Sequence, residues 1–308
     1  MARLDRCSAS DFADSGFQSV GLGTSIAHHG ELFQGQIRGE DGQLRYCLLS
    51  LPCSQLGSKA TFVPDTTGIC RVHPDYKEKV KRVVQLTLSH FQYDHLGGLI
   101  KVESNIAEGK GYGSSTADCV AGAIAAAAAI DHELSEATLA KLVVRAEIAS
   151  DSIMFKHAVL FAHREGSLIE DYLRPAPKIE VLGFDTNVAV RVDTLQYDPA
   201  VYGTHHIQAF HRLREMLAEA IRTQDVRLLA HVATASAAIN EQFLPKPMFQ
   251  EVCTLVKCVG GLGVAAAHSG TILSILFDPQ DPALEKRIDI LHRELSSLGL
   301  SQLMRFHT

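Results

Sequence analysis

Residues 109–118 read Gly109-Lys110-Gly111-Tyr112-Gly113-Ser114-Ser115-Thr116-Ala117-Asp118, and an alanine-rich segment, residues 119–130, follows at once. Glycines let a backbone approach a ligand closely, and hydroxyls donate hydrogen bonds or bind a metal ion. A helix that begins near Ser115 directs unpaired N–H groups at an anion. The stretch therefore predicts an anion site, with phosphate as the candidate ligand. Asp118 leaves a second interpretation open, because a carboxylate in the first turn also favours a well-capped helix after a flexible loop.

The spacing of this stretch excludes two familiar phosphate loops. A Walker A loop has two glycines separated by four residues and then Lys and Ser or Thr, whereas here Lys110 precedes the hydroxyls. The glycines recur at every second residue, which does not match the G-x-G-x-x-G dinucleotide fingerprint. A phosphate bound here therefore belongs to another fold.

The composition bounds the class of protein. A length of 308 residues predicts two domains, at roughly 150 residues each. The formal net charge is −6 and the basic residues are dispersed, which excludes a nucleic-acid binder and favours a small-molecule or protein partner. Seven cysteines without a CxxC pair argue against a disulfide framework and a typical zinc site, and they favour a reducing cytoplasm.

Neither secretion nor a membrane span is expected. The first residues, MARLDRCSASDFADS, include acidic side chains and no apolar core of signal-peptide length. The longest apolar run, residues 117–130, is interrupted by Asp118 and is shorter than the ~20 residues that a bilayer requires. This run is expected to be a buried helix.

Hydrophobic periodicity predicts alternating strands and helices in the first half of the chain. Residues 21–51 are typical of a hairpin around the Glu40-Asp41-Gly42 turn. Further strands are expected at 59–63, 99–104 and 159–162. Helices are expected after Asp75, ending before Gly97, and at 135–149 with Ser135 as N-cap.

The proline-rich segment Arg174-Pro175-Ala176-Pro177 marks a junction between two domains, which we place at 1–174 and 175–308. Beyond it, strands are expected at 179–184, 188–192 and 271–277 and helices at 205–222, 225–240, 249–258 and 284–298. A second glycine-rich segment spans residues 260–270. The fold class is α+β.

Three segments in order resemble the GHMP kinase superfamily, and within it the threonine kinase branch. They are His29-Gly30-Glu31-Leu32-Phe33-Gln34-Gly35, residues 110–118, and residues 261–271 with their Ala-His-Ser-Gly-Thr ending. Residues 151–155, 183–185 and 192–195 also look like that branch, so the resemblance spans almost the whole chain. It implies a two-lobed fold with an N-terminal lobe like ribosomal S5 domain 2 and a ferredoxin-like C-terminal lobe.

The resemblance also implies an activity, which is transfer of the γ-phosphate of ATP to the side-chain hydroxyl of a small amino acid. L-threonine is expected first, in a branch associated with propanediol use and cobalamin synthesis. Serine, homoserine and a nonstandard hydroxy amino acid stay open, as do a homodimer and a catalytically weak sensor on the same scaffold. The Gly-Glu-Leu-Phe-Gln-Gly segment disfavours a sugar or mevalonate kinase.

Site residues follow from the same resemblance. The phosphates of ATP are expected on Lys110, Gly111, Tyr112, Gly113, Ser114, Ser115 and Thr116, and Mg²⁺ on Ser115 and Glu147. Asp151, with the charge of Lys110 nearby, would orient or deprotonate the acceptor hydroxyl. The amino acid would contact Glu31, Gln34, His29, Asp151, His268, Ser269 and Gly270.

Other interpretations of these residues stay open. Lys110 also fits a solvated loop lysine, Asp151 fits an N-cap of the turn that follows it, and Glu31 with Gln34 fits a buried polar pair. The fifteen histidines are scattered without an H-x₃-H or HExxH pattern on a helix, so they are interpreted as hydrogen-bonding groups. Two departures from the family are Ala107, where a proline usually stiffens the loop entry, and the His28-His29 pair, where small residues or cysteine are usual.

Overall fold

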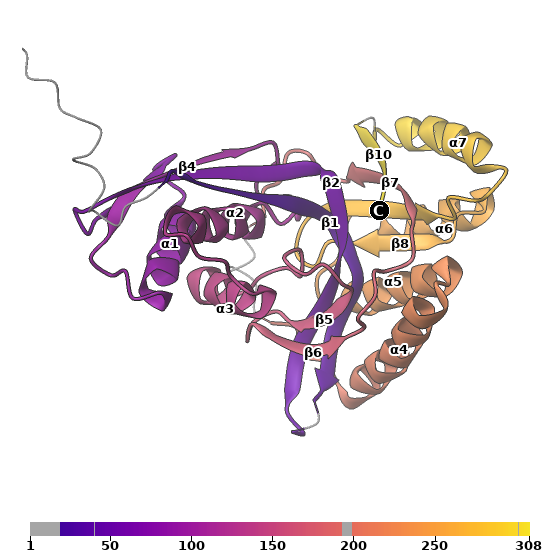
Figure 1. Cartoon of the computed structure of the whole chain (residues 1–308). Coiled ribbons are helices and arrows are strands. Elements are labelled where there is room, and N and C mark those ends of the chain that lie inside the picture. The colour runs from indigo at the N-terminus through magenta and orange to yellow at the C-terminus, as the bar shows by residue number, and fades with distance from the viewer. Residues whose placement is uncertain (1–18, 40, 193–198, 301) are drawn as a thin grey trace, which may run out of the picture.

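One continuous sheet joins two lobes in the computed structural model, which describes residues 19–39, 41–192, 199–300 and 302–308 (Figure 1). Its order is β10-β7-β9-β8-β1-β2-β4-β3, and β5 and β6 branch from β2. The strands are β1 (Gly21–Arg38), β2 (Leu44–Asp65), β3 (Cys70–His73), β4 (Gly97–Ser104), β5 (Val159–Ala162), β6 (Ser167–Asp171), β7 (Glu180–Asp185), β8 (Gly263–Ala266), β9 (Ile272–Phe277) and β10 (Leu303–His307). The helices are α1 (Glu78–His90), α2 (Ser114–Ala129), α3 (Glu136–Glu147), α4 (Thr204–Thr223), α5 (Val226–Asn240), α6 (Phe249–Val259) and α7 (Leu284–Ser297).

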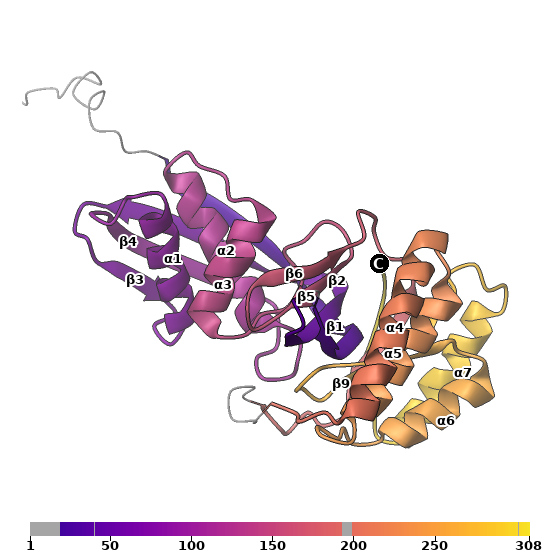
Figure 2. The same cartoon turned by 90° about the horizontal axis from the view of Figure 1, so that it is seen from below.

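The N-terminal lobe is a β1–β2 hairpin, extended by β4 and β3, with α1, α2 and α3 on one face (Figures 1 and 2). The predicted hairpin is confirmed, and the strand expected at 59–63 is the far end of β2. The alanine-rich α2 lies directly against β1. A Cβ at Gly21 or Gly23 would lie 1.9 Å from the Ala125 carbonyl or 2.1 Å from that of Ala121. Small residues on both elements therefore bring the helix and the sheet into backbone contact.

Helix α2 starts at Ser114, and Asp118 lies beyond its first turn, so the interpretation that places its carboxylate in the first turn is wrong. Its buried carboxylate accepts a 2.6 Å hydrogen bond from Ser58 Oγ and pairs with the ammonium of Lys77. Lys77 also binds Glu108 at 2.9 Å. These ion pairs connect the start of α1 to the entry of the glycine loop. Among the described residues, no side chain caps α2, which leaves its first N–H groups for a ligand.

The C-terminal lobe packs α4–α7 on the strands β7 to β10 (Figure 2). Helices were predicted correctly here, whereas the strand expected at 188–192 is wrong. Residues 186–192 form a turn and irregular backbone, and the carbonyls of Asn187, Val188 and Val190 accept hydrogen bonds from an ammonium group, as described below. None of the described helices is long and apolar enough to cross a membrane.

Strand β1 belongs to both lobes. Its first half lies under α2, whereas its second half contributes Leu32, Phe33 and Ile37 to a core shared with α4 and α5. The rings of Phe33 and Phe210 lie 6.2 Å apart, and Glu31 of β1 pairs with Ala266 of β8. The division at residue 174 stays a prediction, but both the sheet and this core cross it. The segments around Glu31 are thereby fixed at the junction of the lobes.

Candidate active site

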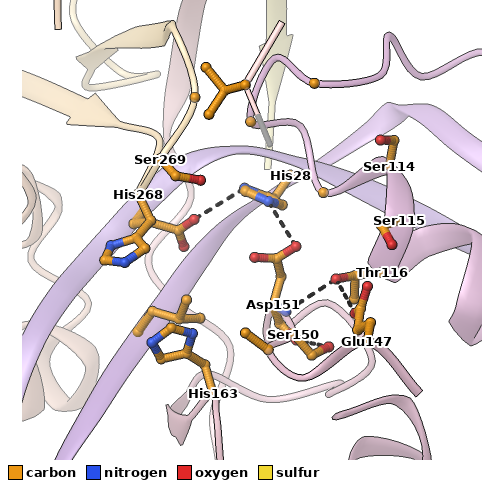
Figure 3. Close-up of a pocket in the computed structure, with 18 of the residues that line it drawn as sticks. His28, Ser114, Ser115, Thr116, Glu147, Ser150, Asp151, His163, His268 and Ser269 are labelled. Carbon is orange, nitrogen blue, oxygen red and sulfur yellow. Dashed lines mark hydrogen bonds and ion pairs between the residues drawn. The ribbon is translucent and has the colours of Figure 1, made fainter. Parts of the chain in front are cut away.

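A pocket of about 180 Å³ opens where the lobes meet (Figure 3). It is lined by residues from β1, the start of α1, the glycine loop, the start of α2, the end of α3 and the loop that follows it, the position directly after β5, and the loop after β8. Those that carry the argument are His28, Glu31, Lys79, Gly111, Gly113, Ser114, Ser115, Thr116, Glu147, Ser150, Asp151, His163, His268, Ser269 and Gly270. Segments far apart in the sequence therefore converge on one concave surface.

The glycine loop that precedes α2 is held by backbone hydrogen bonds from three directions. Thr271 N–H donates to the Lys110 carbonyl at 2.9 Å, Val192 N–H to Gly109 at 2.7 Å, and His28 N–H to Tyr112 at 3.1 Å. Its three glycines have φ of 71°, 95° and 71°, a conformation that other residues rarely adopt. The loop is thus a rigid turn that points the uncapped start of α2 at the pocket.

The C-terminal glycine segment lies in backbone contact with this loop. A Cβ at Gly270 would lie 2.0 Å from the Lys110 carbonyl oxygen, and one at Gly111 would lie 2.6 Å from the Cβ of Ala267. Both positions therefore need glycine because the two loops touch. This contact closes one side of the pocket.

Lys110 is not placed as expected. Its ammonium lies 2.9 Å from Asp185 Oδ2 and donates to the carbonyls of Asn187, Val188 and Val190. These partners use its whole hydrogen-bonding capacity, since an ammonium has three N–H groups. Lys110 thus joins the glycine loop to the C-terminal lobe and turns its charge away from the pocket.

Ser115, Thr116 and Glu147 form an oxygen-rich group at the start of α2. The Thr116 hydroxyl donates to Glu147 Oε1 at 2.7 Å. Burial raises the pKa of Glu147 to about 7, although the hydroxyls of Thr116 and Ser115 act to lower it. Hydroxyl and carboxylate oxygens are ligands that Mg²⁺ prefers. The donor set fits a divalent cation that would restore the charged form of this carboxylate.

Asp151 lies in the loop after α3 and points toward the glycine loop (Figure 3). Its N–H donates to Thr116 Oγ1 at 3.4 Å, and the next residue, Ser152, exchanges hydrogen bonds with Ser50 of β2. Residues 152–157 form turns, as expected, and the Asp151 carboxylate pairs with His28 rather than with an N–H group of these turns. Burial raises the pKa of Asp151, but the charge and hydrogen bond of His28, 3.2 Å away, lower it below its usual value.

Glu31 is fully buried at the base of the pocket. Neither carboxylate oxygen accepts an ordinary hydrogen bond from any residue that the structure describes, and burial raises the pKa of the group. A buried hydrogen-bond acceptor without a donor destabilises the folded protein unless a ligand supplies the donor. Glu31 is therefore ready to receive a cationic or N–H-bearing ligand.

Gln34 does not line the pocket but binds a residue that does. Its Nε2 donates to the Ala266 carbonyl at 3.0 Å, and its Oε1 accepts a hydrogen bond of 3.1 Å from His268 Nδ1. The His268 ring is held in the tautomer that carries a proton on Nδ1. Gln34 therefore orients His268 rather than lining the pocket itself.

His29 and Tyr112 are also outside the pocket. Buried His29 hydrogen-bonds Ser274 at 2.7 Å, and its ring meets that of Tyr112 edge-on at 5.0 Å. Burial lowers the pKa of His29 to about 3, so it is neutral. Alternation along β1 explains the difference from its neighbour, because successive side chains point to opposite faces of a strand. His28 faces the pocket and His29 faces the C-terminal sheet.

The remaining expected residues do line the pocket: Glu31, Gly111, Gly113, Ser114, Ser115, Thr116, Glu147, Asp151, His268, Ser269 and Gly270. Sequence reasoning missed Lys79, Ser150 and His163. Lys79 lies in the first turn of α1, and no motif marks it. The rings of His163 and His268 meet at 5.4 Å, and burial lowers the pKa of His163 to about 3. Only the fold brings these side chains to the site.

The fold and the pocket together define a small-molecule kinase, and comparisons agree. A family model described as the GHMP kinases N terminal domain matches residues 78–157. An L-threonine kinase of Citrobacter freundii is 33% identical over 81% of this chain and 83% of its own length. An L-threonine kinase of Salmonella typhimurium is 32% identical over 84% of each chain.

The chain belongs to the GHMP kinase family and is a phosphotransferase. Similar solved structures include a homoserine kinase from Cytophaga hutchinsonii, with a TM-score of 0.67, 14% identity, and coverage of 99% of this chain and 97% of that one. A mevalonate kinase from Staphylococcus aureus has a TM-score of 0.59 and 17% identity over 93% and 98%. The two-lobed α+β GHMP kinase fold is confirmed.

Proposed function

We propose that this enzyme transfers the γ-phosphate of ATP to the side-chain hydroxyl of L-threonine and forms O-phospho-L-threonine. Two relatives that are about one third identical carry the name L-threonine kinase. The observation that carries the proposal is the Glu31 carboxylate, which is buried at the pocket and accepts no hydrogen bond of ordinary geometry from the described residues, with His28 Nδ1 3.4 Å from its Oε1. The ammonium group of an amino acid supplies the missing donors and charge.

The phosphate donor occupies the glycine loop and the start of α2. Uncapped N–H groups at Ser114 and Ser115 and the helix dipole stabilise its negative charge. The positive charge near the phosphates, which was expected from Lys110, comes instead from Lys79, because Lys79 lines the pocket and Lys110 does not. Ser115 and Glu147 would hold Mg²⁺, which neutralises charge on the phosphates as they separate.

Asp151 acts on the acceptor hydroxyl. Its carboxylate accepts the hydroxyl proton while the threonine oxygen forms a bond to the γ-phosphorus and the bond from that phosphorus to ADP breaks. A depressed pKa keeps Asp151 ionised at neutral pH, which this role requires. The hydrogen bonds to Thr116 and between Ser50 and Ser152 hold the loop that carries it.

The cellular setting belongs to the same proposal. The six cysteines that the structure describes are free thiols, which supports a reducing cytoplasm. The resemblance to the threonine kinase branch supports a role in cobalamin synthesis. A homodimer stays a prediction, and sedimentation of the purified chain tests it.

The test is an ATP-consumption assay with threonine, serine, homoserine and N-acetylthreonine, followed by phosphorus NMR of the products. We expect threonine to be preferred and N-acetylthreonine to be inactive, because acetylation removes the charge that Glu31 recognises. Asp151→Asn is expected to lose about 10²- to 10⁴-fold in kcat. Asp171→Asn is the matched control, because Asp171 is an exposed aspartate outside the pocket.

Absence of any phosphorylated amino acid overturns the kinase proposal. Nucleotide binding without turnover then favours the sensor. Activity of Asp151→Asn equal to that of the Asp171→Asn control overturns the role of Asp151.

A further inference from the structure

His28 lies between two of the carboxylates that line the pocket, those of Glu31 and Asp151. Figure 3 shows its ring facing Asp151. Its Nε2 is 3.2 Å from Asp151 Oδ2, and its Nδ1 is 3.4 Å from Glu31 Oε1 and 3.3 Å from the Gly30 carbonyl. Each ring nitrogen therefore faces an acceptor. A neutral imidazole has one N–H, so only the doubly protonated imidazolium can donate to both sides.

The same three residues could be considered as a metal site, since one ligand atom of each lies within 4.8 Å of the others. A shared metal ion would need one imidazole nitrogen directed at the centre of the group. Here opposite nitrogens serve opposite carboxylates. This arrangement favours a proton on each ring nitrogen of His28 over a metal ion bound by one of them.

The charges around His28 favour the same state. Burial lowers its pKa, but the carboxylates of Asp151 and Glu31 raise the value to about 9. Other titratable groups also interact electrostatically with this set. They are Lys246, Glu147 and the imidazoles of His29, His163 and His268, and burial lowers the pKa of all three imidazoles. The glycine loop packs on the pair, because a Cβ at Gly113 would lie 2.4 Å from His28 Cδ2 and 2.6 Å from Asp151 Oδ2.

We propose that His28 is a positioning residue whose imidazolium bridges Glu31 and Asp151, keeps Asp151 ionised and holds its carboxylate against the phosphate loop. This proposal rests on the proposed function for its catalytic meaning. Two uncompensated carboxylates next to a triphosphate would repel it. One imidazolium reduces their combined charge from −2 to −1, while an oxygen of Glu31 stays available for the ammonium of the acceptor.

The first experiment measures the charge of His28 without turnover. ¹⁵N-labelled protein is titrated by NMR, and the His28 signals are assigned as those missing from His28→Gln. We expect an imidazolium that persists at pH 7 and a His28 pKa that falls by about 1–3 units in Asp151→Asn. A neutral His28 at pH 7, or a titration that Asp151→Asn does not move, overturns the proposal. Bound metal that a chelator removes with a shift of the His28 signals also overturns it.

The second experiment measures the pH dependence of kcat in His28→Gln. Glutamine can place an amide near the position of Nε2 but carries no charge, so Asp151 takes a proton at higher pH. The acid limb of the pH profile of kcat is expected to shift to higher pH by about 1–3 units, with little change in KM for ATP. His28→Lys, which restores a positive charge, is expected to move it back toward the wild-type position.

The matched control is His157→Gln, because His157 faces Asp171 at 3.9 Å in an exposed pair outside the pocket. Its profile should coincide with that of the wild type. An acid limb of His28→Gln that coincides with both overturns the positioning role. If no acceptor is phosphorylated at all, the proposed function fails, and the NMR titration still decides the state of His28.

Discussion

Substitution of Gly270 by alanine tests the contact between the two glycine segments. The added Cβ would lie 2.0 Å from the Lys110 carbonyl oxygen and 2.4 Å from Gly111 Cα, and both atoms belong to the backbone. Ordinary contact begins at 3.4 Å, so the loops must separate by about 1.4 Å. That movement also breaks the 2.9 Å hydrogen bond from Thr271 N–H to Lys110. A displacement of about 1 Å in a catalytic group can cost about 100-fold in rate.

We therefore expect kcat/KM for ATP to fall by about 100-fold in Gly270→Ala, with a lower thermal midpoint. The assay is initial-rate kinetics with threonine in excess, beside a thermal melt of the same sample. Gly42→Ala is the control, since Gly42 has φ of 78° and nothing within 4 Å of its Cβ position. It should lose about 1–2 kcal/mol of unfolding free energy from backbone strain and keep its kcat/KM. Wild-type kcat/KM in Gly270→Ala would refute the reasoning.

Two further predictions concern buried charge. Lys110→Met removes the cation that pairs with Asp185 and should lower the unfolding free energy, measured in urea, by about 3–5 kcal/mol. The double variant Lys110→Met/Asp185→Asn should recover much of this loss. Unchanged stability of Lys110→Met with weaker ATP binding would instead place Lys110 on the phosphates. The folded-state pKa values of His163 and His268, about 3 and about 4, lie below the usual 6.5. On acidification these two histidines take up protons in the unfolded chain before they do so in the folded protein, so the unfolding free energy should fall as pH drops from 6.5 toward 3. His28 has the opposite shift, and its contribution to stability should be lost as pH rises through about 9. Urea midpoints across pH check both trends, and an equally steep acid decline in His163→Gln would contradict the assignment to His163.

Local sequence signals predicted most of the elements. The Ser135 hydroxyl caps α3 by accepting a hydrogen bond from Thr138 N–H, as expected of an N-cap serine. The β1–β2 hairpin and the buried alanine-rich helix also agree, since turn residues and side-chain size act over a few neighbouring residues. The strand expected at 188–192 fails for the opposite reason. Its backbone is used to bind Lys110, which is about 80 residues away in sequence.

The candidate site shows the same division. The three-segment resemblance identified the family, and the glycine and hydroxyl run at 109–118 predicted a phosphate loop within it. Local pattern could not separate Lys110 from Lys79, because the direction of a lysine side chain depends on partners elsewhere in the chain. It also could not show that Gln34 and His29 support the pocket from outside it.

The sequence by itself determined the kinase family, and its glycine and hydroxyl run ahead of an alanine-rich helix predicted the phosphate loop. These are properties of residue type and short-range spacing. Only the tertiary structure decided that His28 lies between Glu31 and Asp151 and that the Lys110 ammonium pairs with Asp185 outside the pocket. Both depend on charges from separate segments, and the partners of a buried charge are set by how those segments pack.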